Sequence, residues 1–338
     1  MRSPMTRTRR VGHGAMLLGI GAVAMPLASC DDTQQPLSPR DTQASELSAA
    51  ALVNTWATKA PMTLARAQAK STSFNNFIFV IGGRTSNGAP RTNVDAYNLT
   101  NNTWAPRAPL PAARTALNGA TTINGLIYVT GGFNSSFQLT KTLYVYNTAN
   151  NTWTKKADMP VVGSCGAQFT TGGQLYVYVG CTGVAFDHRL LRYNPATNIW
   201  ISRAAPPSQH ASPAAAGVIN NRLYLAGGAA NTSPNQSLHV YNPGTNSWIT
   251  RAPMPDVQSN SATGVINGIL FAAGGSDQNG AINTVRAYNP ATNTWSTRLP
   301  MPTARYDAAG TAAGGRLWAM GGFNSAGSVI GKNEAYSP

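Results

Sequence analysis

Acidic, histidine and cysteine side chains are scarce in this chain. Of 338 residues, 11 are Asp or Glu, four are His and three are Cys, and its glutamates are Glu46 and Glu334. Reactions that use paired carboxylates and metal sites that use clustered His and Cys ligands therefore have few residues to draw on. We expect no metal, no cofactor and no catalytic residue, which favours binding over catalysis.

A long apolar run is also missing. Residues 11–27 are apolar but short and interrupted by glycine, and four arginines precede them: Arg2, Arg7, Arg9 and Arg10. Such a stretch is typical of an export signal and is too short for a stable membrane span. Arg9-Arg10 leaves twin-arginine export open, but the residues that follow lack the usual apolar partners and favour the general secretory route.

Cys30 ends the sequence Leu27-Ala28-Ser29-Cys30, which resembles the processing site of bacterial lipoproteins. The resemblance implies that residues 1–29 are a lipoprotein signal peptide and that Cys30 carries the lipid. Residues 30–50, with little apolar content, are then the lipidated cysteine and a flexible tether.

The expected localisation is the bacterial cell envelope, with the lipid as the sole membrane attachment. Asp31 fits a sorting rule for retention at the inner membrane, but that rule does not hold in all bacteria. The periplasmic face of either membrane and the cell surface therefore remain open.

Basic residues outnumber acidic ones, 25 against 11, for a formal charge of +14. Loss of residues 1–29 would remove four arginines and leave a charge of about +10. The remaining basic residues are scattered instead of clustered or interleaved with aromatic residues, so nucleic-acid binding is not expected. A basic surface facing anionic lipid or cell-wall polymers fits the pattern better.

Six tryptophans recur at intervals of 47 to 49 residues: Trp56, Trp104, Trp153, Trp200, Trp248 and Trp295. Each interval holds the same landmarks in the same order, namely an apolar run that ends in a glycine doublet, a Tyr-Asn pair and the next tryptophan. The third unit departs from the pattern, with Gly180-Cys181 in place of the doublet. A period of this length indicates repeated modules.

Each unit is predicted to contain four strands. Before the doublet, two apolar runs flank a tight turn such as Asn267-Gly268, which is a strong hairpin signal. The doublet permits close backbone approach. A polar connection, a short strand that ends in Tyr-Asn and the Asn-x-Trp strand complete the unit. Each tryptophan is expected to pack between neighbouring sheets instead of binding a ligand.

The phrase Tyr-Asn-Pro-Ala-Thr-Asn-Thr-Trp at residues 288–295, nearly repeated at 193–200 and 241–248, resembles the kelch repeat. The resemblance covers residues 51–338 and implies an all-β fold, a six-bladed kelch-type β-propeller with four antiparallel strands per blade. Trp56 has no doublet before it, and the last unit stops at Tyr336 without its tryptophan strand. The N-terminal strand around Trp56 should therefore complete the C-terminal blade, which removes an open sheet edge.

The residues before the first strand of each unit define a candidate recognition face. Aligned on Pro-Met-Pro or Pro-Leu-Pro, the equivalent positions at the channel mouth are Arg66, Arg114, Gly163, His210, Gln258 and Arg305. The five side chains are the predicted ligand-binding residues, and the three arginines are expected to form an arc suited to carboxylate, sulfate or phosphate. The alternative is that each arginine bonds backbone carbonyls of the adjacent blade.

Cys165 and Cys181 flank the predicted hairpin of residues 168–180. Folding of this hairpin brings the two cysteines opposite each other, so a disulfide is expected in an oxidising compartment. The alternative is a reactive or metal-binding cysteine.

These features predict a monomeric binding or scaffold module that holds a protein or glycan partner, including an anionic one, on its loop face. The alternative is a carbohydrate-active enzyme, such as an epimerase or mutarotase of the sialic acid type, with His210 or Asp187-His188 for proton transfer. The Ser-x-Asp-x-Gly-x-Thr-Trp boxes of sialidases are absent. Copper radical oxidases of the kelch type need two tyrosines, one of them cross-linked to a cysteine, and two histidines at one centre, but Cys165 and Cys181 are better explained as a pair.

Overall fold

The structure is a computed structural model that describes residues 54–338 except 185, 186, 231 and 232. The described residues fall in one compact unit. The predicted signal peptide, the lipidation site at Cys30 and most of the region before the first strand lie outside the described residues. Within the described part of the chain, no helix is long and apolar enough to cross a membrane.

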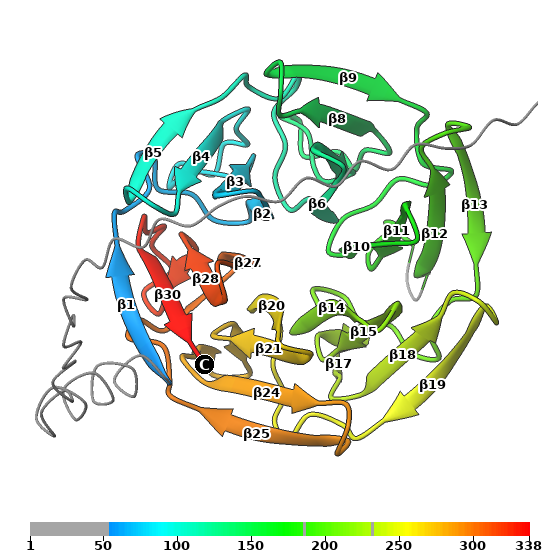
Figure 1. Ribbon diagram of the computed structural model, residues 1–338, viewed down its shortest axis with the longest axis vertical. Helices are drawn as coiled ribbons and strands as arrows, with labels where there is room; N and C mark the ends of the chain where they lie inside the picture. Colours follow the sequence, from blue (N-terminus) through cyan, green and yellow to red (C-terminus); the bar gives the residue numbers. More distant parts are fainter. Residues whose placement is uncertain (1–53, 185–186, 231–232) are drawn as a thin grey trace, which may run out of the picture. The chain divides into compact units, whose positions relative to one another are not determined.

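Six four-stranded antiparallel sheets follow one another around a ring (Figure 1). Blade 1 contains β2 (Lys70–Phe74), β3 (Phe77–Ile81), β4 (Val94–Asn98) and β5 (Thr103–Pro106). Blade 2 contains β6 (Gly119–Ile123), β7 (Leu126–Thr130), β8 (Leu143–Asn147) and β9 (Thr152–Lys156). Blade 3 contains β10 (Ala167–Thr171), β11 (Gln174–Val179), β12 (Arg189–Asn194) and β13 (Ile199–Arg203).

The second half of the ring repeats this order. Blade 4 contains β14 (Ala215–Ile219), β15 (Arg222–Ala226), β18 (Leu238–Asn242) and β19 (Ser247–Arg251). Blade 5 contains β20 (Ala262–Ile266), β21 (Ile269–Ala273), β24 (Val285–Asn289) and β25 (Thr294–Arg298). Blade 6 contains β27 (Ala309–Ala313), β28 (Arg316–Met320), β30 (Asn333–Ser337) and β1 (Thr55–Lys59). The predicted six-bladed propeller is confirmed.

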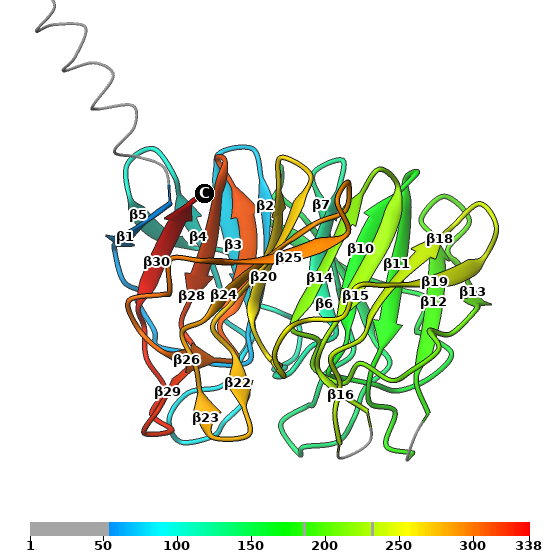
Figure 2. The same cartoon turned by 90° about the horizontal axis from the view of Figure 1, so that it is seen from below.

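Three short ribbons lie between the second and third strands or before the first. They are β16 (Ala229–Ala230) with β17 (Ser233–Pro234), β22 (Ser276–Asp277) with β23 (Gly280–Ala281), and β26 (Arg305–Tyr306) with β29 (Phe323–Asn324). In Figure 2, β22, β23, β26 and β29 lie along the lower edge of the ring. We call this side, which carries the second-to-third-strand loops and the segments before the first strands, the loop face.

The ring closes through the N-terminal strand, as the sequence predicts. β1 pairs with β30 in antiparallel register, with Trp56 opposite Tyr336. The two rings lie 5.2 Å apart between centroids. The strand that begins the described chain therefore supplies the outer edge of the last blade.

One clamp recurs at the junctions between blades. In blade 1, Trp104 packs on Tyr97 with centroids 5.0 Å apart, and its Nε1 donates to Ala60 O at 2.9 Å. Asn102 Oδ1 accepts hydrogen bonds from the Ala60 amide at 2.8 Å and from the Tyr97 hydroxyl at 2.6 Å. The φ of Asn102 is 57°, a left-handed value that asparagine adopts more readily than most residues.

The other five of the six recurring tryptophans make the same indole-to-carbonyl bond across a junction: Trp56, Trp153, Trp200, Trp248 and Trp295. The expectation that these residues pack between sheets is confirmed.

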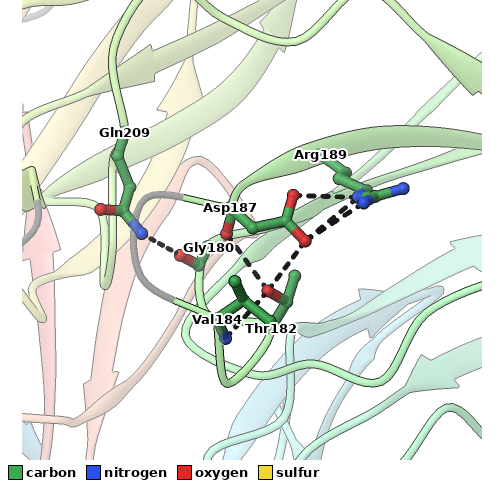
Figure 3. Close-up of polar contacts among 6 residues, drawn as sticks. All are labelled: Gly180, Thr182, Val184, Asp187, Arg189 and Gln209. Carbon is green, nitrogen blue, oxygen red and sulfur yellow. Dashed lines mark hydrogen bonds and ion pairs between the residues drawn. The ribbon is translucent and has the colours of Figure 1, made fainter.

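The glycine doublets let adjacent blades touch through their backbones. Gly83 has a φ of 92°, and its amide donates to Arg114 O of blade 2 at 2.9 Å. A Cβ on Gly82 would lie 2.7 Å from the same oxygen, which leaves no room for a side chain. Blade 3 lacks the second glycine, and there Gln209 Nε2 donates to Gly180 O at 2.7 Å across to blade 4 (Figure 3).

Candidate functional site

The five predicted ligand-binding side chains are buried instead of exposed. Arg66, His210, Gln258 and Arg305 have 0% of their surface exposed, and Arg114 has 5%. The expected accessible arc of arginines is therefore wrong. The physical reason is that each of these side chains bonds inside its own blade.

Two of the arginines form buried ion pairs with the third strand of their blade. Arg66 pairs with Asp95 on β4 and donates from Nη1 to Asn93 O at 3.0 Å. Arg305 Nη2 lies 3.0 Å from Glu334 Oε2 on β30. Burial lowers the pKa of both guanidinium groups, and the paired carboxylates oppose this shift. In blades 1 and 6, these pairs link the segment before the first strand to the third strand at the loop-face end.

Arg114 and Gln258 also bond within their own blades. Arg114 donates to Ala113 O at 2.8 Å, and its guanidinium lies 5.8 Å from the centroid of the Tyr144 ring. Burial lowers the pKa of Arg114. Gln258 Nε2 donates to Gly274 O. The alternative reading of the sequence, bonds to backbone carbonyls, is thus nearer to the structure, although the carbonyls belong to the same blade.

His210 forms a neutral pair with His239. Its Nδ1 lies 2.8 Å from Gly227 O, so this nitrogen must carry the proton and donate. Its Nε2 is then an acceptor for His239 Nδ1, 2.7 Å away. Burial lowers the pKa of His210 to about 3 and also lowers the pKa of His239. A buried histidine held neutral in this way cannot serve a substrate as an acid or base.

Asp187 is engaged within its own loop (Figure 3). Its carboxylate lies 3.0 Å from Arg189 Nε and accepts a hydrogen bond from the Thr182 hydroxyl at 3.0 Å. The hydrogen bond from Arg189 holds the pKa of Asp187 below its usual value. His188 Nε2 lies 3.1 Å from Pro206 O. The two side chains that the sequence offered for proton transfer thus have separate structural partners.

Cys165 and Cys181 are close together, but the structure holds them as free thiols instead of a disulfide. Cys181 exchanges both backbone hydrogen bonds with Ser164, at 3.0 and 3.1 Å, which brings its side chain beside Cys165. The two thiols hydrogen-bond each other, and this bond is the main reason why the pKa of Cys165 falls to about 6. The predicted proximity is correct.

A polar cavity lies at the centre of the ring. A cavity of about 410 Å³ is lined by residues of the first strand of every blade. A second cavity of about 170 Å³ adjoins it, because the two share the lining residues Lys70, Pro213, Ser261 and Ala308. The smaller cavity is lined mainly by residues that precede the first strands, which places it at the loop-face end. We call it the chamber.

Six residues with left-handed backbone encircle the chamber, with φ between 48° and 57°. We call them the channel ring: Gln68, Ala116, Cys165, Ser212, Asn260 and Asp307. Amide-to-carbonyl bonds of 2.9 to 3.1 Å join five of the six neighbouring pairs. Among the described residues the pair Ala116 and Cys165 lacks this bond, beside the irregular blade 3.

Lys70 is the long side chain in this chamber. It is the first residue of β2, whereas the first strands of the other blades begin with Gly or Ala: Gly119, Ala167, Ala215, Ala262 and Ala309. No carboxylate of the described residues lies within ion-pair distance of its Nζ. Burial lowers the pKa of Lys70, while the charges of Asp307 and Cys165 raise it.

Asp307 lines the same chamber. Its Oδ2 accepts a hydrogen bond from Gln68 Nε2 at 3.0 Å. Burial raises the pKa of Asp307, and the Gln68 bond and the charges of Lys70 and Arg84 oppose the shift. Ammonium, carboxyl, thiol and amide groups thus face one space. This set of groups suits a small polar ligand. Among the described residues, no three His, Cys, Asp or Glu side chains lie together as a metal site would require.

Each channel-ring residue stands two positions after a residue that the sequence alignment placed at the channel mouth. Arg66, for example, points into its blade, and Gln68 lines the chamber. The alignment of the six units was therefore right about the segment and wrong about the side chain. The repeated left-handed residue was the missing signal, and Asn260 and Asp307 are types that favour this conformation.

Apolar and aromatic groups are also present on the loop face. Phe137 and Val184, in the second-to-third-strand loops of blades 2 and 3, are 54% and 66% exposed. Tyr306 stacks on Phe323 with centroids 5.2 Å apart, and the Arg84 guanidinium lies 5.0 Å from the centroid of the Phe323 ring. Phe137 and Val184 are thus apolar side chains that the loop face exposes.

Comparison with known proteins agrees with the fold. A family model described as the KLHDC2/KLHL20/DRC7 Kelch-repeats domain matches residues 120–322, and a Kelch motif model matches residues 65–111. None of the curated proteins matches the chain. The solved structure titled "Structure of YjhT" is similar with a TM-score of 0.67 at 17% identity, over 81% of this chain and 95% of that one. At this identity the likeness concerns the fold.

Proposed function

Because this chain belongs to the family of Kelch-repeat domains, we propose that it is a binding module that holds a protein or glycan partner on its loop face. The channel ring and the two buried ion pairs, Arg66 with Asp95 and Arg305 with Glu334, hold that face in one shape. A rigid scaffold reduces the ordering cost of binding.

The chamber is the observation that carries the proposal. It lies at the loop-face end of the channel and contains Lys70, whose ammonium has no ion-pair partner among the described residues. An acidic group of the partner would complete this site by accepting hydrogen bonds from Nζ. Phe137 and Val184 would add apolar contact outside the chamber.

The proposal includes export and a lipid anchor. Its support is the sequence of residues 1–30, with basic residues, a short apolar stretch and a cysteine preceded by Leu-Ala-Ser. The tether of residues 31–50 would leave the propeller free to meet a partner near the membrane. Mass spectrometry of the N-terminal peptide from bacterial membranes tests this part, since an unmodified Cys30 would refute it.

A thermal-shift screen against acidic and neutral sugars and glycan fragments tests the binding site. We expect a ligand with an acidic group to raise the melting temperature of the purified protein, and Lys70→Ala to remove the effect. Alanine begins the first strand in four other blades, so this variant should fold. Lys156→Ala, which removes an exposed charge on β9, is the matched control.

The outcomes separate two modes of binding. Retention of the full shift in Lys70→Ala would exclude the chamber as the site. Loss of the shift in Phe137→Ser alone would locate the partner on the outer loops, and equal responses in both variants and wild type would contradict a loop-face site.

A carbohydrate-active enzyme, an epimerase or mutarotase for an acidic sugar, is the second candidate function. One observation favours it, because Lys70, Cys165 and Asp307 line one chamber and their pKa values are moved toward neutrality by burial or by their neighbours. The acid and base would be these groups, since His210 is buried. Exchange between sugar forms, followed by NMR, should stop in Asp307→Asn and persist in Lys156→Ala; an unchanged rate in Asp307→Asn would refute this candidate.

A further inference from the structure

The chamber has a feature that binding alone does not use, a cysteine pair of which one member faces the cavity. Cys165 is a channel-ring residue and lines the 170 Å³ chamber. Its thiol lies 3.3 Å from the Ser164 hydroxyl and hydrogen-bonds the thiol of Cys181. Small molecules that enter the chamber therefore meet a sulfur atom that has a second sulfur as its neighbour.

The irregularity of blade 3 creates this arrangement. In blade 1 two glycines precede Arg84, which pairs with Ala67, whereas in blade 3 Gly180 alone precedes Cys181, which pairs with Ser164. Gly180 leaves space for the close approach, since a Cβ there would lie 2.3 Å from Cys165 O. The shortened segment brings Cys181 beside the channel ring.

We propose that Cys165 is a peroxide-reactive thiol of the channel and that Cys181 is its resolving cysteine. Reactive cysteines of this kind are accessible, have cationic or hydrogen-bonding neighbours and lie next to a second thiol. Lys70 lines the same chamber and supplies the cationic neighbour. The inference is independent of the partner held on the loop face.

The chemistry balances in two steps. The Cys165 thiolate attacks one oxygen of a hydroperoxide, the O–O bond breaks, and the leaving oxygen takes a proton, which gives a sulfenic acid and water or an alcohol. The Cys181 sulfur then attacks the sulfur of the sulfenic acid, the S–O bond breaks, and water leaves. Two thiols are oxidised to a disulfide and one peroxide is reduced.

The groups around the two sulfurs favour this division of roles. The titratable groups that face Cys165 are Lys70, Asp307, Cys181 and Tyr178. The thiol of Cys181 lowers the pKa of Cys165, burial opposes this shift, and the hydroxyls of Ser164 and Ser212 and the charge of Lys70 lower the pKa further. The bond to Cys165 and burial raise the pKa of Cys181. These directions favour Cys165 as the thiolate that attacks first, with Cys181 keeping its proton until the second step.

The test uses the full chain with Cys30→Ser, which removes the third thiol, after complete reduction. Hydrogen peroxide should convert both remaining thiols to an intramolecular disulfide, seen as the loss of two hydrogen atoms in the intact mass. Cys181→Ser should stop at a sulfenic acid that dimedone traps on residue 165. Cys165→Ala should leave Cys181 reduced, and this variant should fold because Ala116 holds the equivalent ring position.

The rate and its pH dependence separate a reactive site from a passive pair. The rate should reach half its maximum near pH 6, where an ordinary thiol would need a pH near 8.5. Lys70→Ala should react about threefold more slowly at pH 5, where the thiolate is the minor form. Its thiol count should be unchanged, and the control Lys156→Ala should react at the wild-type rate. Oxidation of Cys181 at the same rate in Cys165→Ala, or a half-maximum near pH 8.5 in the wild type, would overturn the proposal.

Discussion

The outer and inner rings of the propeller use the same backbone conformation for different purposes. At the outside, Asn102 and its five counterparts adopt left-handed backbone, and every one of them is asparagine two residues before a tryptophan. Around the channel, six residues adopt the same conformation, and they are Gln, Ala, Cys, Ser, Asn and Asp.

The difference shows whether the side chain or the backbone of a residue makes the contact between blades. In the outer ring the asparagine side chain itself bridges the blades, because its Oδ1 accepts hydrogen bonds from a backbone amide and a tyrosine hydroxyl. In the inner ring, backbone hydrogen bonds join the neighbouring blades, so the side chain is not needed for this contact. The inner positions can therefore carry chemistry, and Cys165 and Asp307 are the clearest cases.

The largest expected effect comes from removing an outer clamp. Trp104→Ala should lower the free energy of unfolding by about 3 kcal/mol, because it removes the packing on Tyr97 and the bond to Ala60 O. Urea unfolding measures this loss, with Lys156→Ala as the surface control. A midpoint equal to that of the control would mean that the clamp does not hold the ring.

Acid should reveal the buried histidine pair that lies behind the inner ring. The pKa of His210 is depressed in the folded state, so the unfolded chain binds the proton first, and stability is lost as the pH falls from about 6.5 toward 3. The loss between pH 7 and pH 5 should be about 2 kcal/mol.

His210→Gln provides the comparison, because glutamine occupies the equivalent position in blade 5. Urea midpoints at the two pH values should differ less in this variant than in wild type. If the urea midpoint changed by the same amount between the two pH values in the variant and in wild type, the histidine pair would not take up a proton on unfolding.

The smallest effect should come from a matched pair of substitutions at the two rings. Asn102→Ala should cost about 1.5 kcal/mol, since it leaves the Tyr97 hydroxyl and the Ala60 amide without their acceptor. Ser212→Ala, at nearly the same φ, should change the free energy of unfolding by less than about 0.5 kcal/mol. Equal losses would remove the proposed distinction between side-chain and backbone bridges.

The repeat explains why the fold was predictable from the sequence. Six copies of the tryptophan, tyrosine and glycine pattern specify six blades, and the incomplete first and last units specify how the ring closes. The pattern also located the segment at the channel mouth. It did not show that Arg66 and Arg305 would find Asp95 and Glu334, which lie 29 residues further along the chain in each case.

The sequence by itself therefore determined the blade count, the strand order, the closure and the structural role of the tryptophans, because these follow from local periodicity and short turns. The tertiary structure alone decided which side chains face the channel. Each channel-ring residue has left-handed backbone and lies only two positions after the residue that the sequence alignment chose. Buried partners on the third strand hold Arg66 and Arg305 away from solvent. Lys70, Cys165 and Asp307 come from different blades and meet in one chamber because the ring closes.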